Sequence, residues 1–156
     1  MVGPGEVEAK VKAGSAPGVM RSRTTVALVY LRAQAGGDFF ADTPFCLAAG
    51  ELRALGHRAD VFEVYLDRED AETSALRLDA VVAAIDDGGY GLVVFEHVWQ
   101  PSLIRRISAL GAVVLLTEPD AAIVAPPLLR LRHLTNNRQP LLDLVAALAD
   151  GSDLLQ

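Results

Sequence analysis

The stretch Thr24-Thr25-Val26-Ala27-Leu28-Val29-Tyr30-Leu31 decides the fold class of this 156-residue chain. It is β-branched and almost continuously apolar, which is typical of a strand buried on both faces of a sheet. A second run of this kind, Leu92-Val93-Val94-Phe95, is shorter and wholly apolar. Because such strands lie in parallel sheets whose faces are covered by helices, the chain is predicted to be an α/β protein.

Segments with helical spacing of apolar residues alternate with the strands. Thr43 and Pro44 suit the first turn of a helix, and Gly56 suits its end because glycine adopts positive φ without strain. The run Asp86-Asp87-Gly88-Gly89 is expected to stop the next helix. The expected elements are strand 24–31, helix 43–55, strand 58–65, a helix with Leu76, Leu78, Val81, Val82 and Ile85, strand 92–95, helix 101–110, strand 112–116, strand 129–134 and helix 140–149.

This alternation predicts a doubly wound, flavodoxin-like or Rossmann-like three-layer sandwich with a parallel five-stranded sheet. One such domain is expected over 24–151, after a flexible leader at 1–23 and before a linker or tail at 152–156. Ligands of such sheets bind beyond the carboxyl ends of the strands, near the point where the strand order reverses. The loops 32–43, 96–101 and 117–121 therefore form the expected binding region.

Composition and charge narrow the classes of partner. The chain is 51% hydrophobic and 22% charged with a formal net charge of −6, so neither a nucleic acid nor a membrane surface is expected to bind it. It has no secretory signal and no apolar run of the roughly 18–20 residues that span a bilayer, which makes a cytoplasmic location the expectation. The single cysteine, Cys46, excludes a disulfide within the chain and a Cys-rich metal site.

Two sequence features have a functional and a plainer interpretation. Gly36-Gly37 lacks the G-x-G-x-x-G spacing, and no G-x-x-x-x-G-K-[ST] motif is present, so nucleotide binding through these motifs is not expected. The glycine pair is then best interpreted as loop flexibility. Cys46 lies one turn into the first helix, where the dipole favours a thiolate. With no histidine in the same loop, a buried, inert thiol is the expectation.

The remaining candidate ligand contacts lie in the strand-end loops. Glu96 and His97 follow the third strand and could reach a ligand by hydrogen bond or metal coordination, or could form an ordinary polar pair. Trp99 could stack on a flat ligand or cover the edge of the core. Glu118 and Asp120 could act as paired carboxylates, or the proline between them could mark a turn. One His and one Glu do not make a metal site, and no Ser-His-Asp or Cys-His set can be assembled, so catalysis by this chain alone is not expected.

Two longer stretches carry a family resemblance. The first is Leu52-Arg53-Ala54-Leu55-Gly56-His57-Arg58-Ala59-Asp60-Val61. The second lies within Ile85–Phe95, where acidic residues and then Gly-Tyr-Gly-Leu-Val-Val lead into the third strand. With the first strand and the final helix, their order resembles the N-terminal cobalamin (B12)-binding domain of B12-dependent radical SAM enzymes, over about 24–151. The chain departs from that family in three places: it has no D-x-H-x-x-G loop, Thr117-Glu118 replaces a Gly-Gly pair, and Thr135-Asn136-Asn137-Arg138 replaces a Gly-Glu-Gly-Glu turn.

The resemblance implies that a corrin lies on the carboxyl ends of the strands. The implied cofactor contacts are Gln34, Gly36, Gly37, Glu96, His97, Trp99, Thr117 and Glu118. A [4Fe–4S] cluster, S-adenosyl-L-methionine and any methyl transfer would belong to a radical SAM catalytic domain in cis or in trans, because this chain lacks C-x-x-x-C-x-x-C.

Two other functions stay open at this point. The departures from the family motivate a degenerate Rossmann-like interaction domain that binds a partner domain and no cofactor. A small hydrolase or transferase using His97, Glu96 or Glu118 is the third alternative.

Overall fold

The computed structural model describes residues 25–33, 43–67, 69–96, 101–117, 128–130 and 137–151. Strands and helices alternate along these ranges, as the sequence predicts. In chain order the elements are β1 (Thr25–Ala33), α3 (Thr43–Ala54), β2 (Arg58–Leu66), α4 (Ala71–Gly88), β3 (Leu92–Phe95), α5 (Pro101–Ala109), β4 (Val113–Leu116), β5 (Leu128–Arg130) and α6 (Gln139–Ala149). The predicted α/β class is therefore confirmed.

The sheet is parallel, and its strand order is β2-β1-β3-β4-β5. The four strands from β2 to β4 form its main body, and the three-residue β5 pairs with β4 through Val114↔Leu128 to Leu116↔Arg130. The chain leaves β1 toward β2 on one side and returns to β3 on the other. The order of strands therefore reverses between β1 and β3, with the carboxyl ends of all strands at one edge.

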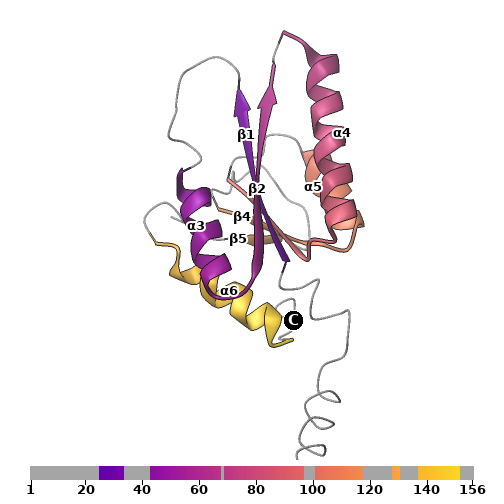
Figure 1. Cartoon of the computed structure of the whole chain (residues 1–156). Helices are drawn as coiled ribbons and strands as arrows, with labels where there is room; N and C mark the ends of the chain where they lie inside the picture. The colour runs from indigo at the N-terminus through magenta and orange to yellow at the C-terminus, as the bar shows by residue number, and fades with distance from the viewer. Residues whose placement is uncertain are drawn as a thin grey trace, which may run out of the picture.

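Helices cover both faces of the sheet (Figure 1). α3 and α6 lie on one face, and α4 and α5 lie on the other. Side chains of β1 alternate between the two layers: Val26 and Leu28 pack with α3 and α6, whereas Ala27, Val29 and Leu31 pack toward α4 and α5. This period of two explains why β1 has to be apolar at nearly every position.

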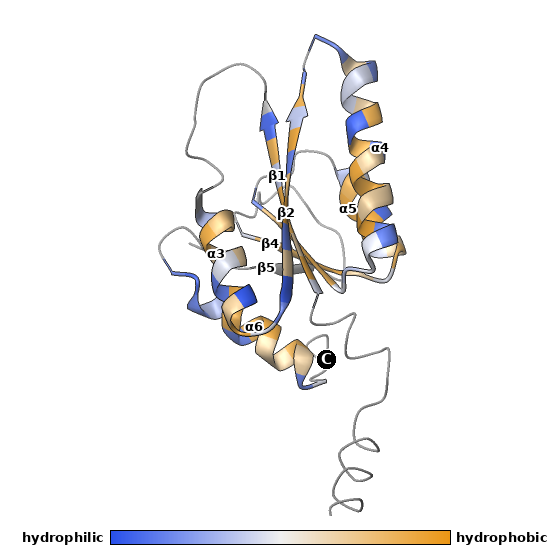
Figure 2. Ribbon diagram, viewed as in Figure 1, coloured by the Kyte–Doolittle hydropathy of each residue, from blue (hydrophilic) through white to orange (hydrophobic). Residues whose placement is uncertain are grey.

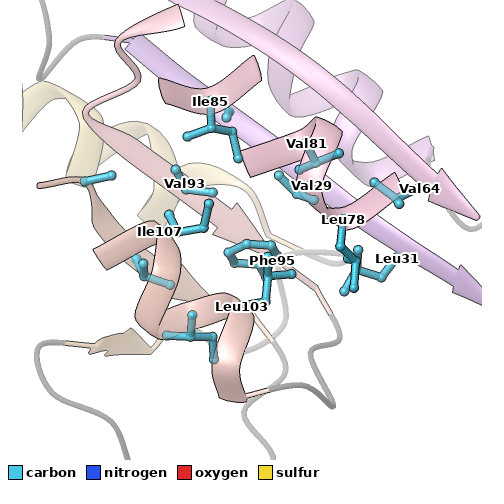
Figure 3. Packing of buried hydrophobic residues seen from close by; sticks show 14 of the residues in the cluster. Val29, Leu31, Val64, Leu78, Val81, Ile85, Val93, Phe95, Leu103 and Ile107 are labelled. Carbon is cyan, nitrogen blue, oxygen red and sulfur yellow. The ribbon is translucent and has the colours of Figure 1, made fainter. Parts of the chain in front are cut away.

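The layer beneath α4 and α5 is centred on β3 (Figure 3). Phe95 is fully buried there, near Leu103 and Ile107 of α5. Leu78, Val81 and Ile85 come from α4 at helical spacing, and all three are buried. In Figure 2 the middle of the strands is hydrophobic, whereas the projecting end of β1 is hydrophilic. On the face covered by α4 the core reaches Leu31, Val64 and Leu66, so at the carboxyl ends of β1 and β2 only the opposite face lies outside it.

Glycine ends α3 as the sequence predicts. Gly56 has φ of 88°, and its N–H donates to the Arg53 carbonyl at 3.0 Å. The next N–H, of His57, donates to the Leu52 carbonyl at 3.0 Å. This pair of bonds is a Schellman motif, which satisfies the last carbonyls of the helix and turns the chain into β2.

Three details differ from the sequence-based expectation. β1 continues to Ala33 instead of ending at Leu31, because Arg32 and Ala33 pair with Tyr65 and Leu66 of β2. Four leucines at apparent helical spacing are exposed, since they lie outside the narrower stripe that meets the sheet: Leu47, Leu55, Leu76 and Leu110. Cys46 is exposed and not buried, because the inward face of α3 is formed by its neighbours Phe45, Ala48 and Ala49.

Several expectations concern residues outside the described ranges. The expected leader and tail lie there, as do residues 131–134 of the strand expected at 129–134. None of the helices in the described part of the chain is both long enough and apolar enough to cross a membrane.

Candidate functional site

Glu96 and Thr117 lie at the carboxyl edge of the sheet. They directly follow β3 and β4, whose last residues, Phe95 and Leu116, are partners in the sheet register. The register therefore places Glu96 and Thr117 next to each other, adjacent to the point where the strand order reverses. Of the residues expected to contact a ligand, the structure brings these two together.

Thr117 fixes the spacing of the two strand ends. It is 2% exposed, and its N–H donates to the Phe95 carbonyl at 2.9 Å. Its hydroxyl donates to the same carbonyl at 3.3 Å. The hydroxyl proton is thus used inside the fold, while the hydroxyl oxygen keeps its capacity to accept a hydrogen bond. Thr117 is therefore a buried residue that ties the end of β4 to the end of β3.

The carboxyl edge is stepped. β1 pairs with β2 from Thr25 to Ala33 but with β3 only from Val26 to Val29. The last four residues of β1, Tyr30–Ala33, therefore continue beyond the end of β3 together with Glu63–Leu66 of β2. At roughly 3.3 Å per residue, this two-stranded ribbon projects about 13 Å past β3. The ribbon is the part of the sheet that extends farthest at the carboxyl edge (Figure 1).

One face of the ribbon has a polar and aromatic cluster, the ribbon cluster: Tyr30, Arg32, Glu63 and Tyr65. Arg32 Nη1 pairs with Glu63 Oε1 at 2.7 Å and donates to the Tyr65 hydroxyl at 3.1 Å. The guanidinium carbon lies 5.7 Å from each of the two tyrosine ring centroids. The ion pair and the cation–π contacts hold the four side chains in one arrangement at the carboxyl edge.

The sequence reasoning missed this cluster because it placed Arg32 in a loop. A signal was present: Tyr30 and Arg32 are two residues apart, as are Glu63 and Tyr65. Polar side chains at a spacing of two indicate strands with one face outside the core. The register Tyr30↔Glu63 and Arg32↔Tyr65 then puts all four on the same face.

A second polar cluster lies at the opposite, amino edge of the sheet. The Tyr90 hydroxyl donates to Asp60 Oδ2 at 2.6 Å and accepts from Arg58 Nη2 at 3.0 Å. Arg58 also pairs with Asp60 at 3.0 Å, and its guanidinium carbon lies 4.7 Å from the centroid of the Tyr90 ring. Burial and the bond to Asp60 raise the pKa of Tyr90, whereas the hydrogen bond from Tyr90 and the pair with Arg58 lower the pKa of Asp60.

This amino-edge cluster connects β2 to the turn before β3. It lies at the opposite edge of the sheet from the carboxyl ends, where a ligand is expected to bind. Tyr90 precedes β3, and Asp60 belongs to β2, so the cluster connects the α4–β3 turn to the far side of β1. The position of His57 after Gly56, at the start of β2, predicts a surface residue at this edge, whereas the structure shows it half-buried.

A bidentate ion pair fixes α6 to α3. Arg138, at the N-terminus of α6, donates from Nε and Nη2 to the two carboxylate oxygens of Glu51, each at 2.8 Å. These hydrogen bonds lower the pKa of Glu51. Parallel bonds of this type specify direction as well as distance. Arg138 therefore ties the start of α6 to α3.

The other candidate contacts lie outside the described residues: Gln34, Gly36, Gly37, His97, Trp99, Glu118 and Asp120. Within the described ranges, no three His, Cys, Asp or Glu side chains are grouped so that they could hold a metal ion. At the ends of β3 and β4, the described polar side chains are the Glu96 carboxylate and the buried Thr117 hydroxyl.

Comparison with other proteins identifies no relative. The chain matches no known protein-family model, no curated protein and no solved structure.

Proposed function

We propose that this chain is a ligand-binding module and that it binds a corrin, cobalamin, at the carboxyl edge of its sheet. The observation that carries the proposal is the meeting of Glu96 and Thr117 at the strand ends beside the reversal of strand order. In open α/β sheets this is the place where ligands bind. The order β2-β1-β3-β4-β5 supports a flavodoxin-like, doubly wound arrangement with five strands as part of the same proposal.

The described residues fit the periphery of a corrin. A corrin is a broad, flat ring that carries amide side arms, and those amides donate hydrogen bonds. The Glu96 carboxylate is an acceptor at the end of β3, and the buried Thr117 holds the end of β4 beside it. The longer ribbon of β1 and β2 lies beside these strand ends in the sheet. The chain would thus hold and orient the ring through its rim.

The loops complete the proposed contact set. Gln34, Gly36, Gly37, His97, Trp99 and Glu118 follow β1, β3 and β4 in the sequence, and we assign them to the same ligand. Bound cobalamin would supply the reactive cobalt centre. The residues of this chain would orient the ring and restrict the access of water to it. We further propose that the reaction itself takes place with a radical SAM catalytic domain, in cis or in trans.

Cobalamin retention tests the proposal directly. The purified 156-residue chain is mixed with hydroxocobalamin and desalted, and the corrin absorbance that stays with the protein is measured. We expect retention close to one equivalent per chain, which is about the limit for one site. Absence of retained corrin would overturn the assignment of cobalamin and would favour the alternative, a degenerate interaction domain that binds a partner domain.

Two acid-to-arginine variants locate the site. Glu96→Arg places a long cation at the carboxyl edge, and we expect it to reduce retention about tenfold or more, a loss of roughly 1.4 kcal/mol in binding free energy. Asp87→Arg makes the same charge change near the end of α4 at the amino edge, where the side chain is exposed, and should keep the wild-type retention. Equal retention by both variants would place the corrin elsewhere. Thermal melts of both variants verify that each is folded.

A further inference from the structure

β2 is the outermost strand on one side of the sheet. It pairs with β1 over nine positions, Thr25↔Arg58 to Ala33↔Leu66, and it is the terminal strand in the order β2-β1-β3-β4-β5. Figure 1 looks onto this side, with β2 in front of β1 and with α3 and α4 on either side of it. A long edge strand with exposed backbone groups is a template on which another strand can pair.

The register shows which backbone groups of β2 point outward. The Thr25 carbonyl accepts from the N–H of Gly91, next to β3, so the odd-numbered residues of β1 face β3 and the even-numbered ones face β2. In a parallel sheet, a residue that faces the neighbouring strand forms its backbone hydrogen bonds with the residues just before and just after its register partner. Val26 is the register partner of Ala59, so it bonds to the neighbours of Ala59, which are Arg58 and Asp60. The even-numbered residues of β2 are therefore the ones that bond to β1. The outward-facing residues are Ala59, Val61, Glu63 and Tyr65.

Two arginine side chains donate hydrogen bonds to outward carbonyls near the two ends of β2. Arg53 of α3 donates from Nε to the Ala59 carbonyl at 2.7 Å. Arg77 of α4 donates from Nη1 to the Tyr65 carbonyl at 2.9 Å. α3 and α4 lie on opposite faces of the sheet, so the two side chains reach around the same edge from both sides.

We propose that Arg53 and Arg77 protect the β2 edge against pairing with a second copy of this chain. The strand is rich in β-forming residues, since its sequence is RADVFEVYL. A second β2 would need the outward carbonyls of Ala59 and Tyr65, and the guanidinium groups already bind them. Of the four outward carbonyls, those of Val61 and Glu63 alone have no described partner. The part of the edge that still offers acceptors is therefore short, and very short edges are poor templates for pairing.

Removal of both arginines tests this proposal. The molar mass of the 156-residue protein is measured by light scattering as it elutes from a size-exclusion column, at increasing concentrations of loaded protein. For Arg53→Ala/Arg77→Ala we expect the mass to rise by about twofold or more over wild type, because identical edges form closed pairs or longer assemblies. The control Arg105→Ala/Arg106→Ala removes the same charge from exposed positions of α5 and should keep the wild-type mass. An unchanged mass in Arg53→Ala/Arg77→Ala would overturn the proposal.

A third variant separates edge pairing from general loss of stability. Glu63→Pro, added to Arg53→Ala/Arg77→Ala, removes an outward N–H without removing a backbone hydrogen bond to β1, and proline is tolerated at such edge positions. It also removes the ion pair between Glu63 and Arg32. We expect this variant to return to the wild-type mass. Association that persists in it would show that another surface is responsible and would contradict the proposal.

Single variants cover the case in which the double variant does not fold. Far-UV circular dichroism shows whether each protein keeps its secondary structure. Arg53→Ala and Arg77→Ala each open one end of β2 and retain the other arginine, and each should associate more weakly than the double variant but more than wild type. If folded single variants both keep the wild-type mass at every concentration, the arginines do not protect this edge.

Discussion

The Tyr90 hydroxyl lies 2.6 Å from Asp60 Oδ2, a contact between residues 30 positions apart in the sequence. Tyr90 is 7% exposed, and its hydroxyl also accepts from Arg58. Tyr90→Phe removes both bonds but keeps the ring, so we expect a loss of about 1–2 kcal/mol in the free energy of unfolding. Urea titration measures this value. Tyr65→Phe is the control, because the exposed Tyr65 hydroxyl donates to Glu63 at 3.1 Å on the surface, and it should change stability by less than about 0.5 kcal/mol.

The pair between Glu51 and Arg138 should make stability depend on acid pH. Arg138 lowers the pKa of Glu51 in the folded protein, so the unfolded chain takes up its proton first as the pH falls. The stabilisation is therefore complete above the unfolded pKa, near 4.3, and is lost as the pH falls through the lower, folded pKa. A double-mutant cycle with Glu51→Gln and Arg138→Gln should show favourable coupling at neutral pH. The same cycle at a pH below the folded pKa should show coupling close to zero, and equal coupling at both pH values would contradict the assignment.

Gly88 is required by the ring of Tyr90. A Cβ at position 88 would lie 2.9 Å from Tyr90 Cδ2 and still closer to Cε2, so Gly88→Ala should displace the ring from Arg58 and Asp60. We expect a loss of about 1–3 kcal/mol, which is typical of overpacking. Gly50→Ala is the matched control within α3, where a Cβ would meet nothing within 4 Å. It should stabilise the protein by about 0.5–1 kcal/mol through helix propensity. Destabilisation by both variants to the same degree would argue against a specific role for Gly88.

Ser74 joins the start of α4 to the end of β2. Its buried hydroxyl donates to the Asp67 carbonyl at 2.9 Å and accepts from the Asp67 N–H at 2.7 Å. Ser74→Ala leaves both backbone groups without this partner, so we expect a loss of about 1–3 kcal/mol in the free energy of unfolding. Ser102→Ala, at an exposed position of α5, should stay within about 0.5 kcal/mol of wild type. Hydrogen exchange should also show a faster Asp67 amide in Ser74→Ala alone.

Parts of the candidate site could be predicted from the sequence because they follow directly from strand ends. The sequence places Leu92–Phe95 in a strand with the observed bounds, so Glu96 is identified as the residue that follows it. Thr117 is found in the same way, after β4. The ribbon cluster could not be found by this route, because the end of β1 is decided by its pairing with β2 and not by its own residues.

The sequence by itself determined the alternation of strands and helices, the apolar strand cores and the glycine that ends α3. Each of these depends on local preferences within a few residues: side-chain shape in strands, helical spacing, and the positive φ of Gly56. Only the tertiary structure decided which leucines face solvent, how far β1 extends, and that Arg138 reaches Glu51 across 87 positions. These depend on contacts between distant segments, whose geometry is set by packing of the whole sheet and is not encoded in any single stretch.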